Sequence, residues 1–168
     1  MSGYFFRAVM LSVIIALQMI PRLVQAADVP LPQFFVTDYQ GNIVSSDTLN
    51  RVETSVLIIV APNNQPSRTL LNGLQMSKIT WTDRIIIIVS SDLSKAAEMK
   101  AQNSKLSNAQ WYRDADGSVM RNLGLSGWPA VLGIVPGGSI AWRAMGAPAT
   151  TQATQGLVAN WIGLVVTP

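Results

Sequence analysis

Few side chains in this sequence could carry out chemistry. The chain of 168 residues contains no cysteine and no histidine. Thiol–disulfide exchange is therefore excluded, and so are a Ser–His–Asp triad and any other histidine-based catalysis. No lysine completes a Ser-x-x-Lys pair either. Ser67 lies at a predicted helix start, and we interpret it as a helix cap rather than a nucleophile.

Cofactor and metal sites are equally poorly supported. Zinc and most transition metals would need Cys or His ligands, and the carboxylates are scattered along the chain. Asp114 and Asp116 hint at a calcium loop, but Gly117 comes too early and no Glu follows at the required position, so we expect a plain turn. No glycine-rich phosphate-binding motif occurs. We therefore expect no cofactor and no metal.

The charge balance argues against a nucleic-acid partner. The chain carries 12 Lys and Arg against 9 Asp and Glu, a formal charge of +3. Two of the positive residues, Arg7 and Arg22, lie in the N-terminal segment, and no basic cluster occurs in the remainder. We expect no binding to nucleic acid or to an anionic membrane surface. A hydrophobic fraction of 49% also excludes general disorder.

The N-terminal segment, residues 1–26, has the pattern of an export signal. Arg7 supplies a positive charge, and Ala8–Ile20 is an apolar run too short to span a bilayer comfortably. A small-x-small pattern ends at Ala26, where we expect cleavage and release into the periplasm. Residues 27–168 would then form one domain held together by its core without disulfides. The alternative is an uncleaved anchor, and a membrane contact is expected only in that case.

Two apolar runs rich in β-branched residues, Ser55–Ala61 and Arg84–Ser90, predict strands that are buried on both faces of a sheet. Between them, Pro66 and Ser67 would open a helix over Arg68–Ser77. The other expected strands are Phe34–Thr37, Asn42–Val44, Gln110–Arg113, Ala130–Val135 and Ile140–Arg143, and the other expected helices lie around Leu49, after Asp92 or Ser94, at Val119–Leu123, and from Thr150 or Thr151 to near Gly163. Buried strands that alternate with helices predict an α/β sandwich.

Several short phrases, in this order, resemble the exported branch of the thioredoxin-like superfamily, which includes the thiol reductases of cytochrome c maturation and peroxiredoxin-like proteins. Leu31–Asn42 is similar to its opening hairpin, and Asp114–Gly117 to its Asp-Pro-Asp-Gly turn. Gly127-Trp128-Pro129 is similar to a Gly-Val-Pro motif of this branch, in which the proline is cis. Gly137–Ile140 and Gly146-Ala147 are similar to the hairpin and the Gly-Ala pair that follow this motif. The resemblance implies a three-layer sandwich with a central mixed sheet, flanking helices and an N-terminal β-hairpin.

The segment Ala61–Arg68 (APNNQPSR) lies where redox-active members read Ala-x-Trp-Cys-x-Pro-Cys-Arg. Asn64 stands at the position of the attacking cysteine and Ser67 at that of the resolving cysteine, while Pro66 and Arg68 match. An amide and an unactivated hydroxyl cannot replace a thiolate at a helix N-terminus. The peroxidase version of the fold also lacks its cysteine here. The resemblance therefore implies a retained scaffold without the reactive pair.

The same resemblance implies a binding groove, because the residue before the cis-proline faces the motif and offers its backbone to an extended polypeptide. Trp128 would be either a packing lid over a disused site or an aromatic anchor within that groove. The expected groove consists of Asn63, Asn64, Gln65, Pro66, Ser67, Arg68, Trp128 and Pro129.

These observations favour a redox-inactive periplasmic protein that is not an enzyme and acts by binding. Its partner would be another envelope protein or an extended polypeptide, and its role that of an assembly factor, adaptor or folding helper. Two alternatives remain at this stage. One is an oxidoreductase of thioredoxin or peroxiredoxin type that works with thiols of a partner. The other is a structural subunit of an envelope assembly.

Overall fold

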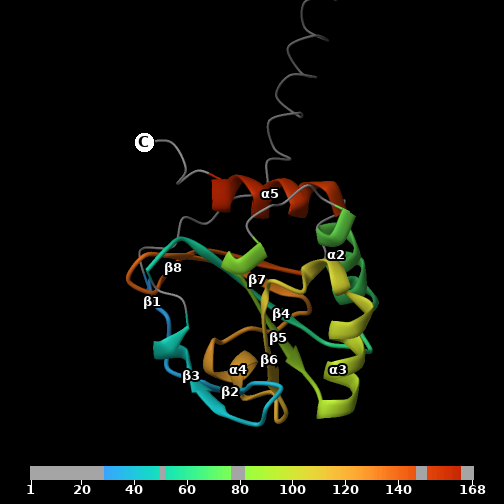
Figure 1. Cartoon of the computed structure of the whole chain (residues 1–168). Helices are drawn as coiled ribbons and strands as arrows, with labels where there is room; N and C mark the ends of the chain where they lie inside the picture. Colours follow the sequence, from blue (N-terminus) through green and yellow to red (C-terminus); the bar gives the residue numbers. More distant parts are fainter. Residues whose placement is uncertain (1–28, 50–51, 77–81, 147–150, 164–168) are drawn as a thin grey trace, which may run out of the picture.

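A computed structural model describes residues 29–49, 52–76, 82–146 and 151–163 (Figure 1). The strands are β1 (Val29–Pro30), β2 (Phe35–Thr37), β3 (Ile43–Ser45), β4 (Ser55–Val60), β5 (Ile85–Ser90), β6 (Gln110–Asp114), β7 (Ala130–Val135) and β8 (Ser139–Met145). The helices are α2 (Gln65–Met76), α3 (Leu93–Gln102), α4 (Ser118–Asn122) and α5 (Thr151–Gly163), with 3-10 turns η2 (Ser46–Thr48), η3 (Thr82–Arg84) and η4 (Ser104–Leu106).

The expected signal segment, residues 1–26, lies outside the described residues, and so does Thr150 as a cap of the last helix. In the described part of the chain, no helix combines the length and the apolar character that a membrane crossing requires.

All eight strands form one mixed sheet in the order β1-β8-β7-β4-β5-β6-β2-β3. The parallel strands β4, β5 and β6 are linked by α2 and α3, as expected for strands that need a crossover connection. Strand β7 then runs antiparallel to β4, and β8 antiparallel to β7. The β2–β3 hairpin pairs with β6 at one end of the sheet. This arrangement confirms the central mixed sheet, the flanking helices and the N-terminal hairpin.

Alternate residues of the central strands pack into two separate cores, because successive side chains of a strand point to opposite faces. Val56, Ile58 and Val60 of β4 enter the cluster beneath α2, α3 and α5. Leu57 and Ile59 enter the cluster that includes the α4 residues and the N-terminal lead-in. Figure 1 shows the same division, with α2, α3 and α5 on one side of the sheet and α4 on the other. This explains why both faces of the predicted strands are apolar.

The first helix begins earlier than the sequence pattern predicted. Helix α2 starts at Gln65, so that Pro66 lies in its first turn rather than before it. Proline is tolerated there because the first backbone N–H groups of a helix have no partner within the helix. The expected short helix around Leu49 is the 3-10 turn η2, which ends just before this residue.

Helix α5 is held to the sheet through its own Trp161, which contacts Trp142 of β8 and Ser55 of β4. The indole of Trp161 stands edge-on to that of Trp142, with the ring centroids 5.7 Å apart. Trp161 Nε1 also donates a hydrogen bond of 3.0 Å to the carbonyl of Ser55 at the start of β4. The Trp142 ring lies directly over Gly133 of β7, in the space that a Cβ would occupy.

Candidate functional site

The start of α2 is organised by Asn64. Its Oδ1 accepts a hydrogen bond from the backbone N–H of Ser67 and another from the Ser67 hydroxyl, both of 2.9 Å. Its backbone carbonyl accepts from the N–H of Arg68 at 3.2 Å. These are the contacts of a helix N-cap, since the side-chain oxygen satisfies a first-turn N–H that has no partner within the helix. The cap is therefore Asn64, and the interpretation of Ser67 as the cap was wrong.

Ser67 instead ties the helix to the strand that precedes it. Its Oγ accepts a hydrogen bond of 3.2 Å from the N–H of Ala61, directly after β4, while its hydrogen is directed to Asn64. The residue is fully buried. A hydroxyl that is buried and bonded on both sides cannot attack a substrate, which agrees with the exclusion of Ser67 as a nucleophile.

The loop that carries Trp128 and Pro129 lies beside the carboxyl end of β4. Ala130 at the start of β7 pairs with Ile59, one residue before the end of β4, so the residues preceding Ala130 reach the edge where α2 begins. The Trp128–Pro129 peptide bond is cis. The carbonyl of Pro129 accepts a hydrogen bond of 2.8 Å from Gly146, and this contact closes the loop against the end of β8.

Trp128 is half-buried and packs against the core cluster on the α4 side of the sheet. That cluster lies on the face opposite α2, whose buried leucines belong to the other core. The ring therefore combines a packed side with a part that solvent can reach. Both properties suit an aromatic anchor at the margin of a binding surface.

Met145 is a candidate that the sequence did not reveal. It pairs with Ala130 across the sheet, and a Cβ on Gly127 would lie 3.8 Å from the Met145 Cβ. Its side chain is 53% exposed. Methionine side chains are flexible and polarizable, and they adapt to varied apolar partners. No local pattern marks this residue, because its position next to the Trp128 loop depends on the β7–β8 register.

The predicted groove residues differ in accessibility. Asn63, Gln65 and Arg68 are exposed, Asn64, Pro66 and Trp128 are half-buried, and Ser67 and Pro129 are buried. Ser67 and Pro129 are thus inaccessible to a partner, whereas the other six residues each expose part of their surface.

Arg68 is oriented by its own loop. Its Nη1 donates to the carbonyl of Pro62 at 2.7 Å, and its Nε and Nη2 donate to Gln65 Oε1 at 3.2 and 2.8 Å. The residue also lines a pocket of about 240 Å³ between α2 and α3. The complete lining consists of Pro62, Asn63, Arg68, Asn72, Lys95, Glu98, Met99, Gln102 and Asn103. Two predicted groove residues, Asn63 and Arg68, therefore belong to this pocket as well.

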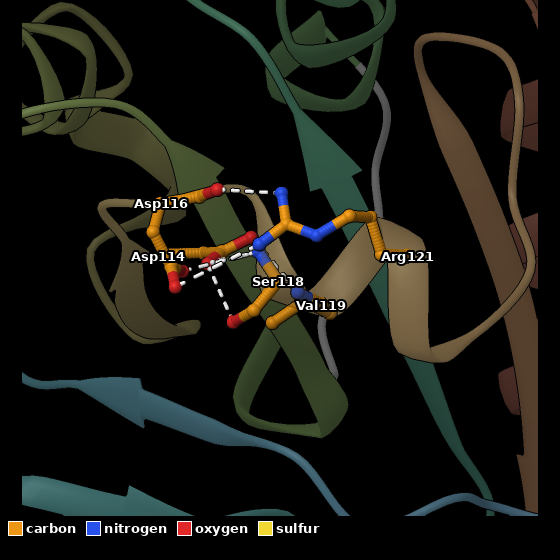
Figure 2. A network of polar contacts seen from close by, with 5 residues as sticks. All are labelled: Asp114, Asp116, Ser118, Val119 and Arg121. Atoms are coloured by element: carbon orange, nitrogen blue, oxygen red, sulfur yellow. Dashed lines mark hydrogen bonds and ion pairs between the residues drawn. The ribbon is translucent and has the colours of Figure 1, made fainter.

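The acidic turn after β6 has a structural role, as Figure 2 shows. Asp114 Oδ1 accepts from the Ser118 N–H and hydroxyl, and its Oδ2 accepts from the Val119 N–H at 3.2 Å, so it satisfies the first turn of α4. Asp116 also accepts from the Ser118 N–H, and the Arg121 guanidinium donates to the Asp116 carbonyl at 2.8 Å. These contacts match the expected turn. Within the described residues, no group of three or more potential metal ligands occurs.

The two carboxyl groups of this turn differ in acidity. Burial raises the pKa of Asp114 above its ordinary value, and a hydrogen bond with Asp116 raises it further. Hydrogen bonds from Ser118 hold the pKa of the exposed Asp116 below its ordinary value. The pair therefore favours a proton on Asp114 rather than on Asp116.

Comparison with known proteins identifies the fold through structure alone. No protein-family profile and no curated protein matches the sequence. A putative thiol:disulfide interchange protein DsbE from Chlorobium tepidum is 20% identical, with a TM-score of 0.60, over 79% of this chain and 96% of that protein. A secreted disulfide oxidoreductase from Mycobacterium tuberculosis is 17% identical, with a TM-score of 0.62, over 76% and 95% of the two chains. StoA from Bacillus subtilis is 15% identical, with a TM-score of 0.56, over 77% and 97%.

The chain therefore has the thioredoxin-like fold, as the resemblance implied, and it contains no cysteine. Each of these similar structures is matched over almost its whole length. At the helix start, this chain has a closed network of hydrogen bonds between Asn64 and Ser67.

Proposed function

We propose that this protein is a redox-inactive, thioredoxin-like protein of the bacterial periplasm that acts by binding another envelope protein. The partner would contribute an extended segment, which lies across the start of α2 and the loop at Trp128 and Pro129. The role would be that of an assembly factor, adaptor or folding helper. The protein would not act as an enzyme.

The main support for this proposal comes from the hydrogen bonds of Asn64 and Ser67. Asn64 and Ser67 bond to each other and to the backbone at the helix start, and neither offers a reactive group. The neighbouring loop still has its cis peptide bond and its closure by Gly146. A surface without a reactive group at these two positions is better suited to binding than to catalysis.

The side chains around this loop support an apolar contact. Trp128 is half-buried and Met145 is 53% exposed, and Gly127, the residue before Trp128, lies next to Met145. Aromatic residues and methionine are enriched in protein interfaces. Asn63 and Gln65 at the start of α2 are exposed and offer hydrogen-bonding groups. This combination fits a polypeptide segment with at least one apolar side chain.

The periplasmic location is supported by the N-terminal pattern of positive charge, short apolar run and small-x-small site. One of the structurally similar proteins is itself described as secreted. The absence of cysteines is compatible with an oxidising compartment, because the core is large enough to stabilise the fold without disulfides.

Site-specific photo-crosslinking in the periplasm would test the proposal. A benzoylphenylalanine at Met145 should yield a discrete adduct with a second protein, and Trp128→Ala should abolish that adduct. The matched control places the same group at Val52, which is 85% exposed and precedes the opposite end of β4. Equal adducts from both positions, or no adduct from Met145, would contradict the proposal. An adduct that persists in the Trp128 variant would instead favour a structural subunit bound through another surface.

A further inference from the structure

The pocket between α2 and α3 contains an oriented cation. The three hydrogen bonds of the Arg68 guanidinium go to the Pro62 carbonyl and the Gln65 amide oxygen, which are both uncharged. These bonds fix the position of the guanidinium, but neither of the two acceptors carries a negative charge that would balance the charge of Arg68. A guanidinium has five N–H donors, so two remain for a ligand. An arginine oriented in this way is prepared for bidentate binding of a carboxylate.

A second cation reaches the pocket from the opposite helix. Lys95 forms an ion pair with Asp92, in which Nζ and Oδ2 are 3.6 Å apart and the side chains are 52% and 58% exposed. Exposed pairs of this kind are weak because water screens them. The Lys95 ammonium can therefore turn toward an anion in the pocket. Together with Arg68 it places two positive charges in the lining, one on each helix.

The single carboxylate of the lining restricts the kind of anion. Glu98 Oε1 accepts a hydrogen bond of 3.0 Å from Gln102, and the remaining oxygen sites of this carboxylate can accept from a ligand. Glu98 repels an anion with several negative charges, such as phosphate, more strongly than a group with a single negative charge, so a carboxylate is the better fit. A ligand that combines one carboxylate with an N–H donor would satisfy both signs of charge. Asn63 and Asn72 add amide groups to the lining, whereas the amide of buried Asn103 is already bonded to Gln75 and to the Met99 carbonyl.

We propose that this pocket binds the carboxylate of an amino acid or of an acidic peptide residue. Arg68 is the principal partner of the carboxylate, Lys95 assists it, and Glu98 accepts an N–H from the same ligand. The volume of about 240 Å³ accommodates one residue of this kind. The pocket shares Asn63 and Arg68 with the groove proposed above, whereas Lys95 and Glu98 on α3 lie outside that groove. Binding at the pocket can therefore be measured separately from binding at Trp128.

Amide-detected NMR titrations of the mature protein would test the pocket. The probes are free L-glutamate, the blocked peptide acetyl-Gly-Glu-Gly-amide, its Gln counterpart and inorganic phosphate. Saturable shifts at Asn72, Lys95 and Gln102 with either carboxylate probe are expected, and the Gln peptide should produce none. Binding of free glutamate alone would identify a small amino acid as the ligand, whereas binding of the Glu peptide would identify a polypeptide.

Two arginine variants distinguish binding in the pocket from nonspecific attraction of an anion to positive charge on the protein. Arg68→Gln should weaken binding about tenfold, in line with the loss of a charge-assisted hydrogen bond. Arg143→Gln, on β8, is the matched control, because this exposed arginine contacts the Leu123 carbonyl after α4 on the other face of the sheet. The proposal is wrong if neither carboxylate probe shifts the pocket, if phosphate or the Gln peptide binds equally well, or if both variants lose affinity equally. None of these readouts involves Trp128 or Met145, so this failure is distinct from a failure of the groove.

Discussion

The Oδ1 atom of Asn64 accepts hydrogen bonds of 2.9 Å from both the backbone N–H and the hydroxyl of Ser67. In the motif resemblance noted in the sequence, Asn64 aligns with the attacking cysteine of redox-active thioredoxin-like proteins and Ser67 with the resolving cysteine. The amide oxygen thus receives the helix N–H that would otherwise stabilise a thiolate. In this protein the two residues form a helix cap, which contributes to local stability.

Removal of this cap should destabilise the fold. Asn64→Ala leaves the Ser67 N–H and the buried Ser67 hydroxyl without their shared acceptor, so we expect a loss of about 1–2 kcal/mol in the free energy of unfolding. Urea denaturation followed by circular dichroism measures this loss. Asn63→Ala at the exposed neighbouring position is the control and should change the value by less than about 0.5 kcal/mol. Equal effects of the two substitutions would contradict the role of Asn64 as the cap.

Restoration of the cysteine pair should create a redox-active site. In the double variant Asn64→Cys/Ser67→Cys, two side chains that are already in contact become thiols at a helix N-terminus, a position that lowers a thiol pKa. We expect an intramolecular disulfide under oxidising conditions and measurable insulin reduction, whereas the wild-type protein should neither reduce insulin nor consume peroxide.

Thiol titration and mass measurement report the disulfide in this variant, and the single variant Asn64→Cys is the control because it has no resolving thiol. A double variant that keeps two free thiols under oxidant would show that the scaffold no longer supports the pair. Activity of the wild-type protein in either assay would contradict the redox-inactive assignment.

Gly133→Ala should disturb the attachment of α5. A Cβ at this position would overlap the indole of Trp142, which packs against Trp161 of α5. Because a buried tryptophan cannot move without displacing its neighbours, we expect a loss of about 1–3 kcal/mol in the free energy of unfolding. Gly156→Ala in α5, where a Cβ would meet nothing within 4 Å, should leave stability unchanged or increase it by up to about 1 kcal/mol. Chemical denaturation of both variants separates these outcomes.

The acidic turn should contribute two opposite pH dependences. Because the pKa of Asp114 is raised, the folded state keeps the proton on this carboxyl group to a higher pH than the unfolded state does. The contribution of Asp114 to stability is therefore complete below pH 3.8 and is lost as the pH rises through its raised pKa. Asp116, with a lowered pKa, contributes stability above 3.8 that is lost as pH falls through its folded pKa.

Carbon-detected NMR titration of the carboxyl groups tests this assignment directly. Asp116→Asn should move the pKa of Asp114 back toward 3.8, but not completely, because burial is the larger cause of the shift. An unchanged Asp114 pKa in this variant would show that the two carboxyl groups are not coupled.

Much of the architecture follows from local sequence patterns. The runs that became β4 and β5 could be recognised because unbroken apolar, β-branched residues have few alternatives to a strand buried on both faces. The absence of cysteine and histidine decided, without any structure, which reactions the chain cannot perform. Helix starts were less accurate, and the cap was assigned to Ser67 rather than Asn64. The pattern locates a helix start to within a few residues, but the choice between two capping side chains depends on backbone geometry.

Tertiary structure decided how distant residues meet. Met145 lies beside the Trp128 loop because of the β7–β8 register, and the pocket exists because α2 and α3 carry Arg68, Lys95 and Glu98 to one place. The bond from Trp161 to Ser55 joins residues 106 positions apart. Such contacts produce no periodic pattern in the sequence, because each of these residues would fit its own strand or helix equally well if other residues packed against it. The sequence by itself indicated the strands from β2 to β8 and the excluded chemistry, but it did not reveal β1, whose two residues are a strand because they pair with β8. Packing between elements determined the surfaces that are left for binding.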